Sequence, residues 1–219
     1  EGKKMSKSSK NGVSPLEVID KYGADVARLH VHFLAGYEDN CMWTFKGIEG
    51  ITNFVDRVWK LQDMIKGDDV SKEHVIELNK LIKKTGEDYE NLKLNTAISA
   101  CMIFLKKIKE DGFITKEELR QFLIILNPLA PHITSEMYER AFGQDILDQS
   151  YPEYDESKIV EDEISLPIQV NGKFKTTIKV SRDSTQDEIV SQIKSKNLID
   201  LENVKKTIYV PNKIINFIV

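Results

Sequence analysis

A short segment near the N-terminus carries the residue types best suited to chemistry. Between Lys3 and Lys10 the chain places four lysines and three serines, and the turn-forming pair Asn11-Gly12 follows. Lysines supply positive charge, while serine hydroxyls and backbone amides supply hydrogen-bond donors. Because bulky apolar side chains are scarce here, the segment can lie close to a polyanion. The sequence therefore predicts a loop that binds phosphates.

Two short helices are expected to support this loop. Ser14, Pro15 and Glu17 have the types and spacing of an N-cap, a first helical residue and a capping-box partner, and Gly23 is suited to end that helix. A second helix is predicted over residues 25–34. Its predicted apolar face consists of Val26, Leu29 and Phe33.

The middle of the chain predicts a helix bundle. Apolar residues recur there at helical spacing, and turn residues and a second capping box, Thr115 to Glu118, separate the runs. Short connections between such helices favour an antiparallel arrangement. The predicted helices cover residues 47–66, 71–89, 94–111, 115–126 and 133–142.

From about Tyr151 the composition changes. Tyr151 and the acidic run 161–163 are typical of a linker. Asn171-Gly172 predicts a tight hairpin turn, because both positions tolerate positive φ. The predicted elements are a hairpin over 164–180, a helix over 184–196 and two strands over 205–219. The predicted fold class is therefore mainly α, an antiparallel helix bundle, with a small C-terminal α+β domain.

Composition narrows the class of protein. The chain has 219 residues, 41% hydrophobic and 30% charged, which fits a globular protein of two or more domains. No apolar run approaches the roughly 18 residues of a membrane span, and no secretory signal is evident. We therefore expect a cytoplasmic protein without membrane contact and, because the loop starts almost at Glu1, a fragment. Cys41 and Cys101 lack C-x-x-C spacing, so both are expected to be reduced and structural.

Charge is unevenly distributed along the chain. The net charge is −4, but residues 164–219 carry 9 basic and 5 acidic side chains, and the residues before them carry 22 and 30. The C-terminal part is therefore the better candidate for binding a polyanion.

Other conspicuous residues are expected to be structural. His30 and His32 lie two positions apart on a predicted helix and so on different faces, and no metal site is predicted. His132 follows a proline at a helix start, which favours packing or capping over catalysis. Trp43 and Trp59 could stack on a base, but helical periodicity favours a core position for Trp59.

Lys4-Met5-Ser6-Lys7-Ser8 resembles the K-M-S-K-S signature of class I aminoacyl-tRNA synthetases at all five positions. Shorter motifs along essentially the whole chain resemble, in the same order, the bacterial-type leucyl-tRNA synthetases. They are Tyr22-Gly23-Ala24-Asp25, Arg28-Leu29, Trp43, Gly47, Glu49-Gly50, Arg57-Val58-Trp59, Leu94-Asn95-Thr96-Ala97, Ala130-Pro131-His132, Gln169-Val170-Asn171-Gly172-Lys173 and Tyr209-Val210-Pro211.

The resemblance implies three parts. Residues 1–45 would hold the signature loop and its supporting helices, 46–155 a helical bundle of the anticodon-binding-domain type, and 156–219 an α+β tRNA-binding domain. The family's H-I-G-H signature, leucine pocket and editing domain are absent from this sequence. We therefore expect the fragment alone not to activate leucine.

The family's reaction gives the loop its expected role. These ligases activate leucine with ATP, release pyrophosphate, and transfer leucine to tRNA(Leu). By its place in the motif, Lys7 would be the catalytic cation on the departing pyrophosphate, and Lys4 would help hold the closed loop. Ser6 and Ser8 would bind ATP or pyrophosphate oxygens or brace the turn. Mg²⁺ is expected with ATP in the full enzyme, with no cofactor on the fragment, and Ser9 departs from a pattern in which lysine often follows the motif.

The resemblance also implies contacts with tRNA. The bundle is expected to recognise tRNA by its shape and through contacts with its backbone. The tail is expected to contact the tRNA elbow. Lys173, Lys175 and Lys179 share parity in a strand and are expected to share one face. The predicted tRNA-binding residues are Lys173, Lys175, Lys179, Arg182, Lys205 and Lys206. The expected partners are tRNA(Leu), with ATP and leucine in the full enzyme, and the protein is expected to be a monomer.

Two alternatives stay open. A valyl, isoleucyl or methionyl relative would share the signature loop, although the missing cysteine clusters and the compact tail ending at Val219 favour leucine. The chain could instead be a stand-alone, non-catalytic tRNA-binding module. An upstream H-I-G-H core would support the enzyme, whereas a start codon near Glu1 would support the module.

Overall fold

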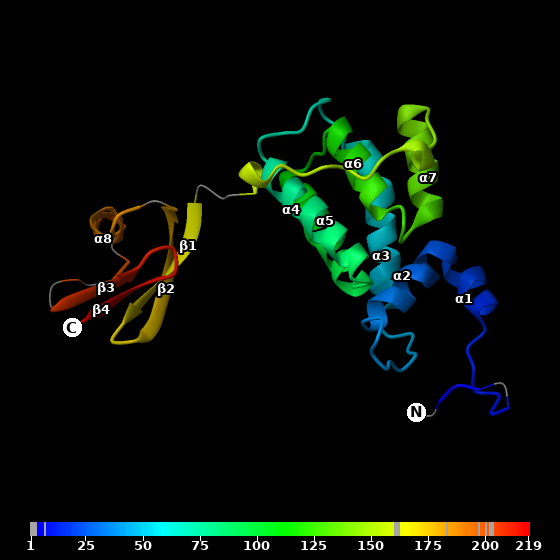
Figure 1. Ribbon diagram of the computed structural model, residues 1–219, viewed down its shortest axis with the longest axis horizontal. Helices are drawn as coiled ribbons and strands as arrows, with labels where there is room; N and C mark the ends of the chain where they lie inside the picture. Colours follow the sequence, from blue (N-terminus) through cyan, green and yellow to red (C-terminus); the bar gives the residue numbers. More distant parts are fainter. Residues whose placement is uncertain are drawn as a thin grey trace. The chain divides into compact units, whose positions relative to one another are not determined.

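The computed structural model describes residues 4–6, 8–159, 163–182, 184–196, 198–199, 201 and 204–219. Contacts divide the chain into two compact units, Glu1–Ile159 and Val160–Val219 (Figure 1). The first is helical and the second combines a small sheet with one helix. The predicted fold class, mainly α with a small C-terminal α+β part, is confirmed.

Two short helices follow the N-terminal loop. They are α1 (Pro15–Tyr22) and α2 (Ala24–Leu34), and Gly23, with φ of 88°, separates them. The predicted capping box is wrong, since the Ser14 side chain makes no cap hydrogen bond. Val26 and Leu29 are buried as predicted, but Phe33 is 41% exposed because the buried face of α2 is completed by His30 instead.

The bundle consists of five further helices and one 3₁₀ turn. They are α3 (Ile48–Trp59), η1 (Lys60–Met64), α4 (Val75–Glu90), α5 (Leu94–Asp111), α6 (Lys116–Leu126) and α7 (Pro131–Phe142). Their apolar stripes share one core with α1 and α2, as amphipathic periodicity predicts. Large, fully buried side chains at its centre include Leu29, Ile51, Ile98, Phe122 and Tyr138.

Three predicted helix boundaries differ from the structure. The first bundle helix ends at Trp59 and tightens into η1 rather than continuing to residue 66. The next begins at Val75 rather than Ser71, because the Glu118 carboxylate accepts hydrogen bonds from both the backbone and the hydroxyl of Ser71 and holds it in the preceding turn. The last begins two residues early, at Pro131, which suits a first helical position.

The end of the helical unit packs on α4. Tyr151 was predicted to lie in a linker, but its hydroxyl lies 2.6 Å from the Thr85 hydroxyl and donates to the Ile82 carbonyl at 3.2 Å. The short 3₁₀ turn η3 (Glu156–Lys158) also contacts α4, and Lys83 forms an ion pair with Glu156. Residues 151–159 are therefore part of the first unit, and the acidic run 161–163 lies almost entirely outside the described residues.

The second unit is a four-stranded sheet covered on one face by a helix. Its elements are β1 (Glu163–Val170), β2 (Lys173–Ser181), α8 (Gln186–Ser195), β3 (Lys206–Val210) and β4 (Ile214–Ile218). The strand order is β2-β1-β4-β3, with β1 parallel to β4 and the other pairs antiparallel. Ile189 and Ile193 of α8 pack on Leu166, Ile178 and Phe217 of the sheet. The predicted Asn171-Gly172 turn is confirmed, with φ of 49° and 76°.

A β-bulge interrupts the hairpin. Ile168 pairs with Thr176, but its neighbour Gln169 pairs with Phe174, so Lys175 is an extra residue in β2. An extra residue reverses the side-chain alternation on the two sides of the bulge. This feature decides which lysines share a face of the sheet.

In the part of the chain that the structure describes, no helix is both long and apolar enough to cross a bilayer.

Candidate functional site

The N-terminal loop is organised around one serine hydroxyl. Ser6 Oγ donates to Ser9 Oγ at 2.7 Å, accepts from the Ser9 backbone N–H at 3.1 Å and lies 3.2 Å from Ser8 Oγ. Three hydroxyls therefore gather on one short turn, as a loop that donates to phosphate oxygens requires.

Asn11 closes this loop from its far end. Its side-chain oxygen accepts from the Ser6 backbone N–H at 3.0 Å, and its side-chain nitrogen donates to the Lys4 carbonyl at 3.2 Å. Lys10 takes the left-handed conformation, with φ of 49°, which turns the chain back so that Asn11 can reach both groups. Sequence reasoning treated Asn11 only as half of a turn and missed this clamp, although asparagine side chains commonly bond nearby backbone.

The predicted loop residues are open to solvent where the structure describes them. Lys4 and Ser8 are exposed and Ser6 is partly exposed. Lys7, the predicted catalytic cation, lies outside the described residues, so its role remains a prediction.

A buried carboxylate joins the supporting helices to the bundle. Asp25, at the start of α2, is 7% exposed and accepts from the Ile133 backbone N–H at 2.7 Å and from the His132 backbone and Nδ1 at 3.3 and 2.8 Å. These amides are orphan donors of the first turn of α7, and a negative charge there is favoured by the helix dipole. His132 therefore takes part in the cap of α7, one of the two structural roles that the sequence favoured, and is not a packing residue because its side chain is 70% exposed. The loop's support is fixed to α7 by this cap.

The aromatic candidates are mainly packing residues. His30 is buried, its Nε2 lies 2.7 Å from the Thr44 carbonyl, and its ring meets Trp43 edge to face at 5.3 Å. Trp59 packs against the core, with the Arg140 guanidinium 5.0 Å from its ring. Burial and nearby Arg28 lower the pKa of His32 below its ordinary value.

The two cysteines differ in environment. Cys101 is fully buried, which raises the pKa of its thiol to about 12, whereas Cys41 is exposed and so is not a packing residue. Within the described ranges, no three His, Cys, Asp or Glu side chains are grouped as a metal site requires.

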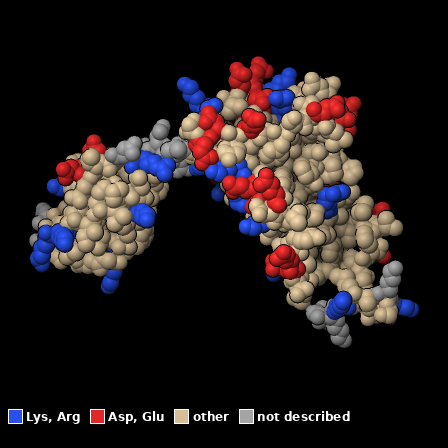
Figure 2. Space-filling model, in the orientation of Figure 1, with Lys and Arg blue, Asp and Glu red and all other residues tan. Residues whose placement is uncertain are grey.

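The structure does not gather the predicted tail residues into one patch. Lys173, Lys175, Lys179, Arg182, Lys205 and Lys206 are all exposed. The prediction that the β2 lysines share one face of the sheet is wrong. Because of the bulge at Lys175, Lys173 lies opposite Val170 on the core-facing side of the sheet, whereas Lys179 lies opposite Ser165 on the other face. Lys206 shares the face of Lys179 but lies on the opposite edge strand, three strand spacings or about 14 Å across the sheet and about six residues further along it. Figure 2 shows Lys and Arg side chains spread over the drawn face of this unit.

The sequence of the chain matches two protein-family models. Residues 1–44, the loop and its helix pair, match the model of the class I tRNA synthetases for I, L, M and V. Residues 72–191, more than half of the chain, match the model of the anticodon-binding domain of tRNA ligase. The chain therefore belongs to the family of tRNA-ligase anticodon-binding domains, preceded by a piece of class I synthetase sequence.

Two relatives extend this assignment over nearly the whole chain. Leucine–tRNA ligase of Alkaliphilus oremlandii (strain OhILAs) is 37% identical over 222 residues, which cover 99% of this chain and 28% of that protein. The crystal structure of a ternary complex of Agrobacterium radiobacter K84 agnB2 LeuRS, tRNA and LeuAMS superposes with a TM-score of 0.77 at 26% identity, over 99% of this chain and 32% of that one. The chain thus spans about a third or less of either relative.

Proposed function

We propose that the chain is the C-terminal part of a leucine–tRNA ligase, contributing the ATP-facing signature loop and tRNA-binding domains. The single observation that carries the proposal is the 37% identity to a leucine–tRNA ligase along 99% of the chain, with the loop, helix pair and bundle in the same order. The class I model covers ligases for four amino acids, so the choice of leucine rests on this relative.

In the proposed reaction, ATP activates leucine and pyrophosphate departs. Negative charge grows on the departing pyrophosphate, so a cation that binds it more tightly in the transition state lowers the barrier. Lys7 is our candidate for that cation, with Lys4 holding the closed loop, Ser8 donating to phosphate oxygens and Ser6, whose hydroxyl donates to Ser9, bracing the turn. The convergence of hydroxyls on Ser6 and the Asn11 clamp support this assignment, because preorganised donors cost no reorganisation during the reaction. Mg²⁺ is expected to accompany ATP in the full enzyme.

The test is Lys7→Ala in the complete ligase. We expect leucine-dependent exchange of pyrophosphate into ATP to fall about 100-fold, or about 3 kcal/mol, as when one preorganised donor is lost. Lys72→Ala, which removes an exposed lysine before α4, is the matched control and should exchange normally. Normal exchange by the Lys7 variant would refute the role of the loop.

The same assay separates the alternatives. The isolated chain is expected not to activate leucine, because the leucine pocket is not among its residues. A complete protein that exchanges pyrophosphate with valine, isoleucine or methionine instead would overturn the leucine assignment. A complete protein that exchanges with no amino acid, yet binds tRNA, would be a stand-alone tRNA-binding module.

We also propose a division of labour along the chain. Residues 1–45 position the loop, 46–155 bind the body of tRNA(Leu), and 156–219 bind its elbow through the exposed basic residues of the tail. The proposed protein acts as a monomer in the cytoplasm. Deleting residues 164–219 should weaken binding of tRNA(Leu), and unchanged binding would count against the tail.

A further inference from the structure

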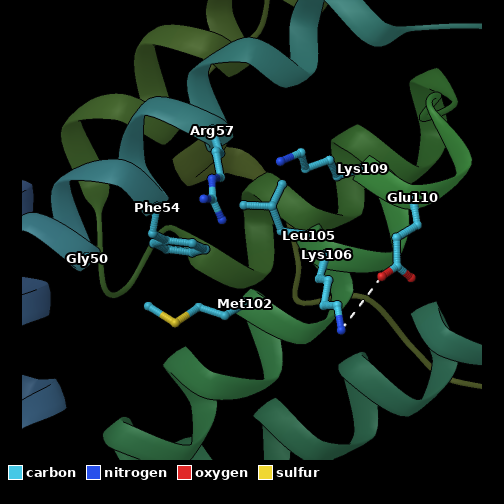
Figure 3. A pocket seen from close by; sticks show the side chains of 8 residues that line it. All are labelled: Gly50, Phe54, Arg57, Met102, Leu105, Lys106, Lys109 and Glu110. Carbon is cyan, nitrogen blue, oxygen red and sulfur yellow. Dashed lines mark ion pairs between the residues drawn. The ribbon is translucent and has the colours of Figure 1, made fainter.

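A groove runs between α3 and α5 in the helical unit, away from the N-terminal loop in sequence. Its volume is about 450 Å³. Figure 3 shows side chains of both helices converging on it, with Arg57 reaching from α3 toward Leu105 and Lys109 of α5. The lining residues are Gly50, Phe54, Arg57, Met102, Leu105, Lys106, Lys109 and Glu110, which include three cations and one carboxylate.

Two of the three cations are available to a ligand. Lys106 lies 3.6 Å from Glu110 in an exposed i, i+4 pair, which is a weak interaction. Arg57 and Lys109 form no ion pair with any described residue. The helical unit, residues 1–159, carries 22 basic and 27 acidic side chains. A positive groove is therefore a local exception on an acidic unit, and an approaching polyanion would be attracted to it.

The floor of the groove is apolar and its mouth is open. Phe54 and Leu105 are buried at 4% and 5% exposure, and Met102 is partly buried beside them. At Gly50 an added Cβ would meet no heavy atom within 4 Å, so a strand can pass close to the helix backbone there. Such a groove is suited to a nucleic-acid strand, because its apolar floor can contact ribose and base edges while the cations on its two walls contact the phosphates.

We propose that this groove binds the sugar-phosphate backbone of tRNA, with Arg57 and Lys109 contacting phosphates from opposite walls. The inference rests on the proposed function and deepens it, because it names the surface of the bundle that holds the tRNA body. Arg57 can present two parallel donors to one phosphate, while Lys109 acts as a point charge. Backbone contacts of this kind position tRNA without reading its sequence.

The test compares binding of a tRNA(Leu) transcript to the 219-residue chain and to its Arg57→Gln/Lys109→Gln variant across a range of salt concentrations. Each lost phosphate contact reduces the slope of log K against log salt by about 1, so the double variant should lose about 2 from the slope. Its affinity near 0.1 M salt should fall by about tenfold or more. An unrelated transcript should lose the same slope, since the contact is not sequence-specific.

Gly50→Glu is the second variant, because it adds a negative charge to the groove at a position where an added Cβ meets no heavy atom within 4 Å. This variant should weaken the binding of tRNA. The control variant Lys60→Gln/Lys72→Gln removes two exposed cations outside the groove lining, and its slope of log K against log salt should equal that of the wild type. Unchanged affinity and slope in both groove variants would overturn the proposal, as would binding of an acidic peptide that tRNA does not displace. Absence of tRNA binding by the wild-type chain would also count against the groove. The proposed function fails only if the complete protein does not exchange pyrophosphate with leucine, so the two failures are distinguished.

Discussion

At the scale of single residues, the Glu118 carboxylate is held by four hydrogen bonds in the core of the helical unit. Its side chain is fully buried and accepts from the Thr115 backbone at 2.9 Å, from the Ser71 backbone and hydroxyl at 2.7 Å each, and from His74 Nδ1 at 2.9 Å. The other ring nitrogen of His74 lies 2.8 Å from Asp111. Burial alone would raise the pKa of Glu118, but these hydrogen bonds outweigh burial and hold that pKa below its usual 4.5.

Glu118→Gln should destabilise the helical unit by about 3 kcal/mol at pH 7, because it breaks a buried charged network. Since the folded pKa is depressed, the carboxylate's contribution is fully present above about pH 5.5 and is lost as pH falls through 4.5 and below. The stability gap between wild type and variant should therefore narrow toward pH 3. Urea unfolding followed by tryptophan fluorescence measures it.

Glu117→Gln is the matched control. Glu117 pairs with Arg120 at 2.9 Å on a partly exposed surface, so its loss should cost about 1 kcal/mol or less. If the difference in the free energy of unfolding between wild type and Glu118→Gln stays constant from pH 7 to pH 3, the role assigned to the ionised Glu118 carboxylate is contradicted.

The sequence predicted only part of this residue's role. The spacing of Thr115 and Glu118 gave the capping box, which the structure contains. It could not give Ser71 or His74 as partners, because they lie 47 and 44 residues away and no local pattern joins them. The misplaced start of α4 follows from the same missing contact.

At the scale of elements, α2 and α7 are joined through a side chain rather than through backbone. Asp25 belongs to the helix pair that supports the N-terminal loop, and it caps a helix more than 100 residues further along the chain. The position of that helix pair therefore depends on a bundle helix, so a disturbance of the α7 N-terminus should reach the loop's support.

Asp25→Ala should lower the free energy of unfolding by about 1–2 kcal/mol, as expected when a helix loses its cap. Local opening should appear as faster hydrogen exchange at the Ile133 amide. His132→Ala should cost less, since that side chain is 70% exposed. Asp20→Ala, on an exposed turn of α1, should leave exchange at Ile133 unchanged, and equal effects of Asp20→Ala and Asp25→Ala would refute the cap.

Secondary-structure features that depend on one local rule were predictable. Those that depend on the pairing register between strands were not. Asn171-Gly172 fixed the hairpin turn because few other residues accept positive φ at both positions. The bulge at Lys175 was not predictable from alternation, since alternation assumes an uninterrupted strand. The predicted shared face of Lys173 and Lys179 failed for that reason alone.

At the scale of the whole molecule, two separate cores exist. One is built from the helices of the first unit and the other from the sheet and α8. The helical periodicities before residue 150 and the strand patterns that begin after residue 163 predicted this division, because the type of element changes between them; the predicted helix over 184–196 packs on the sheet of the second core as α8. Both tryptophans of the chain, Trp43 and Trp59, belong to the first unit, so their fluorescence reports on that unit alone.

Phe217→Ala should remove about 3–5 kcal/mol from the second unit, since Phe217 is 1% exposed in its core. The sheet amide signals in an NMR spectrum should be lost at lower urea concentration than in wild type, while the midpoint of the tryptophan transition stays the same. Phe122→Ala, in the first core, should do the reverse. A tryptophan midpoint that moves with Phe217→Ala would show that the two cores unfold as one.

The buried cluster at Glu118 also fixes an order of assembly. Ser71 and Glu118 bracket the hairpin of α4 and α5, whose connection at residues 91–93 lies at the opposite end from His74 and Asp111. Contacts between Ser71 and Glu118 that form before the hairpin would close a long loop at an entropic cost with few other contacts to offset it. The hairpin should therefore form first, starting at its connection, and the cluster at Glu118 should form last. We therefore expect Glu118→Gln to leave the folding rate almost unchanged and to speed unfolding. The cluster would then set the lifetime of the folded helical unit rather than the speed of its formation.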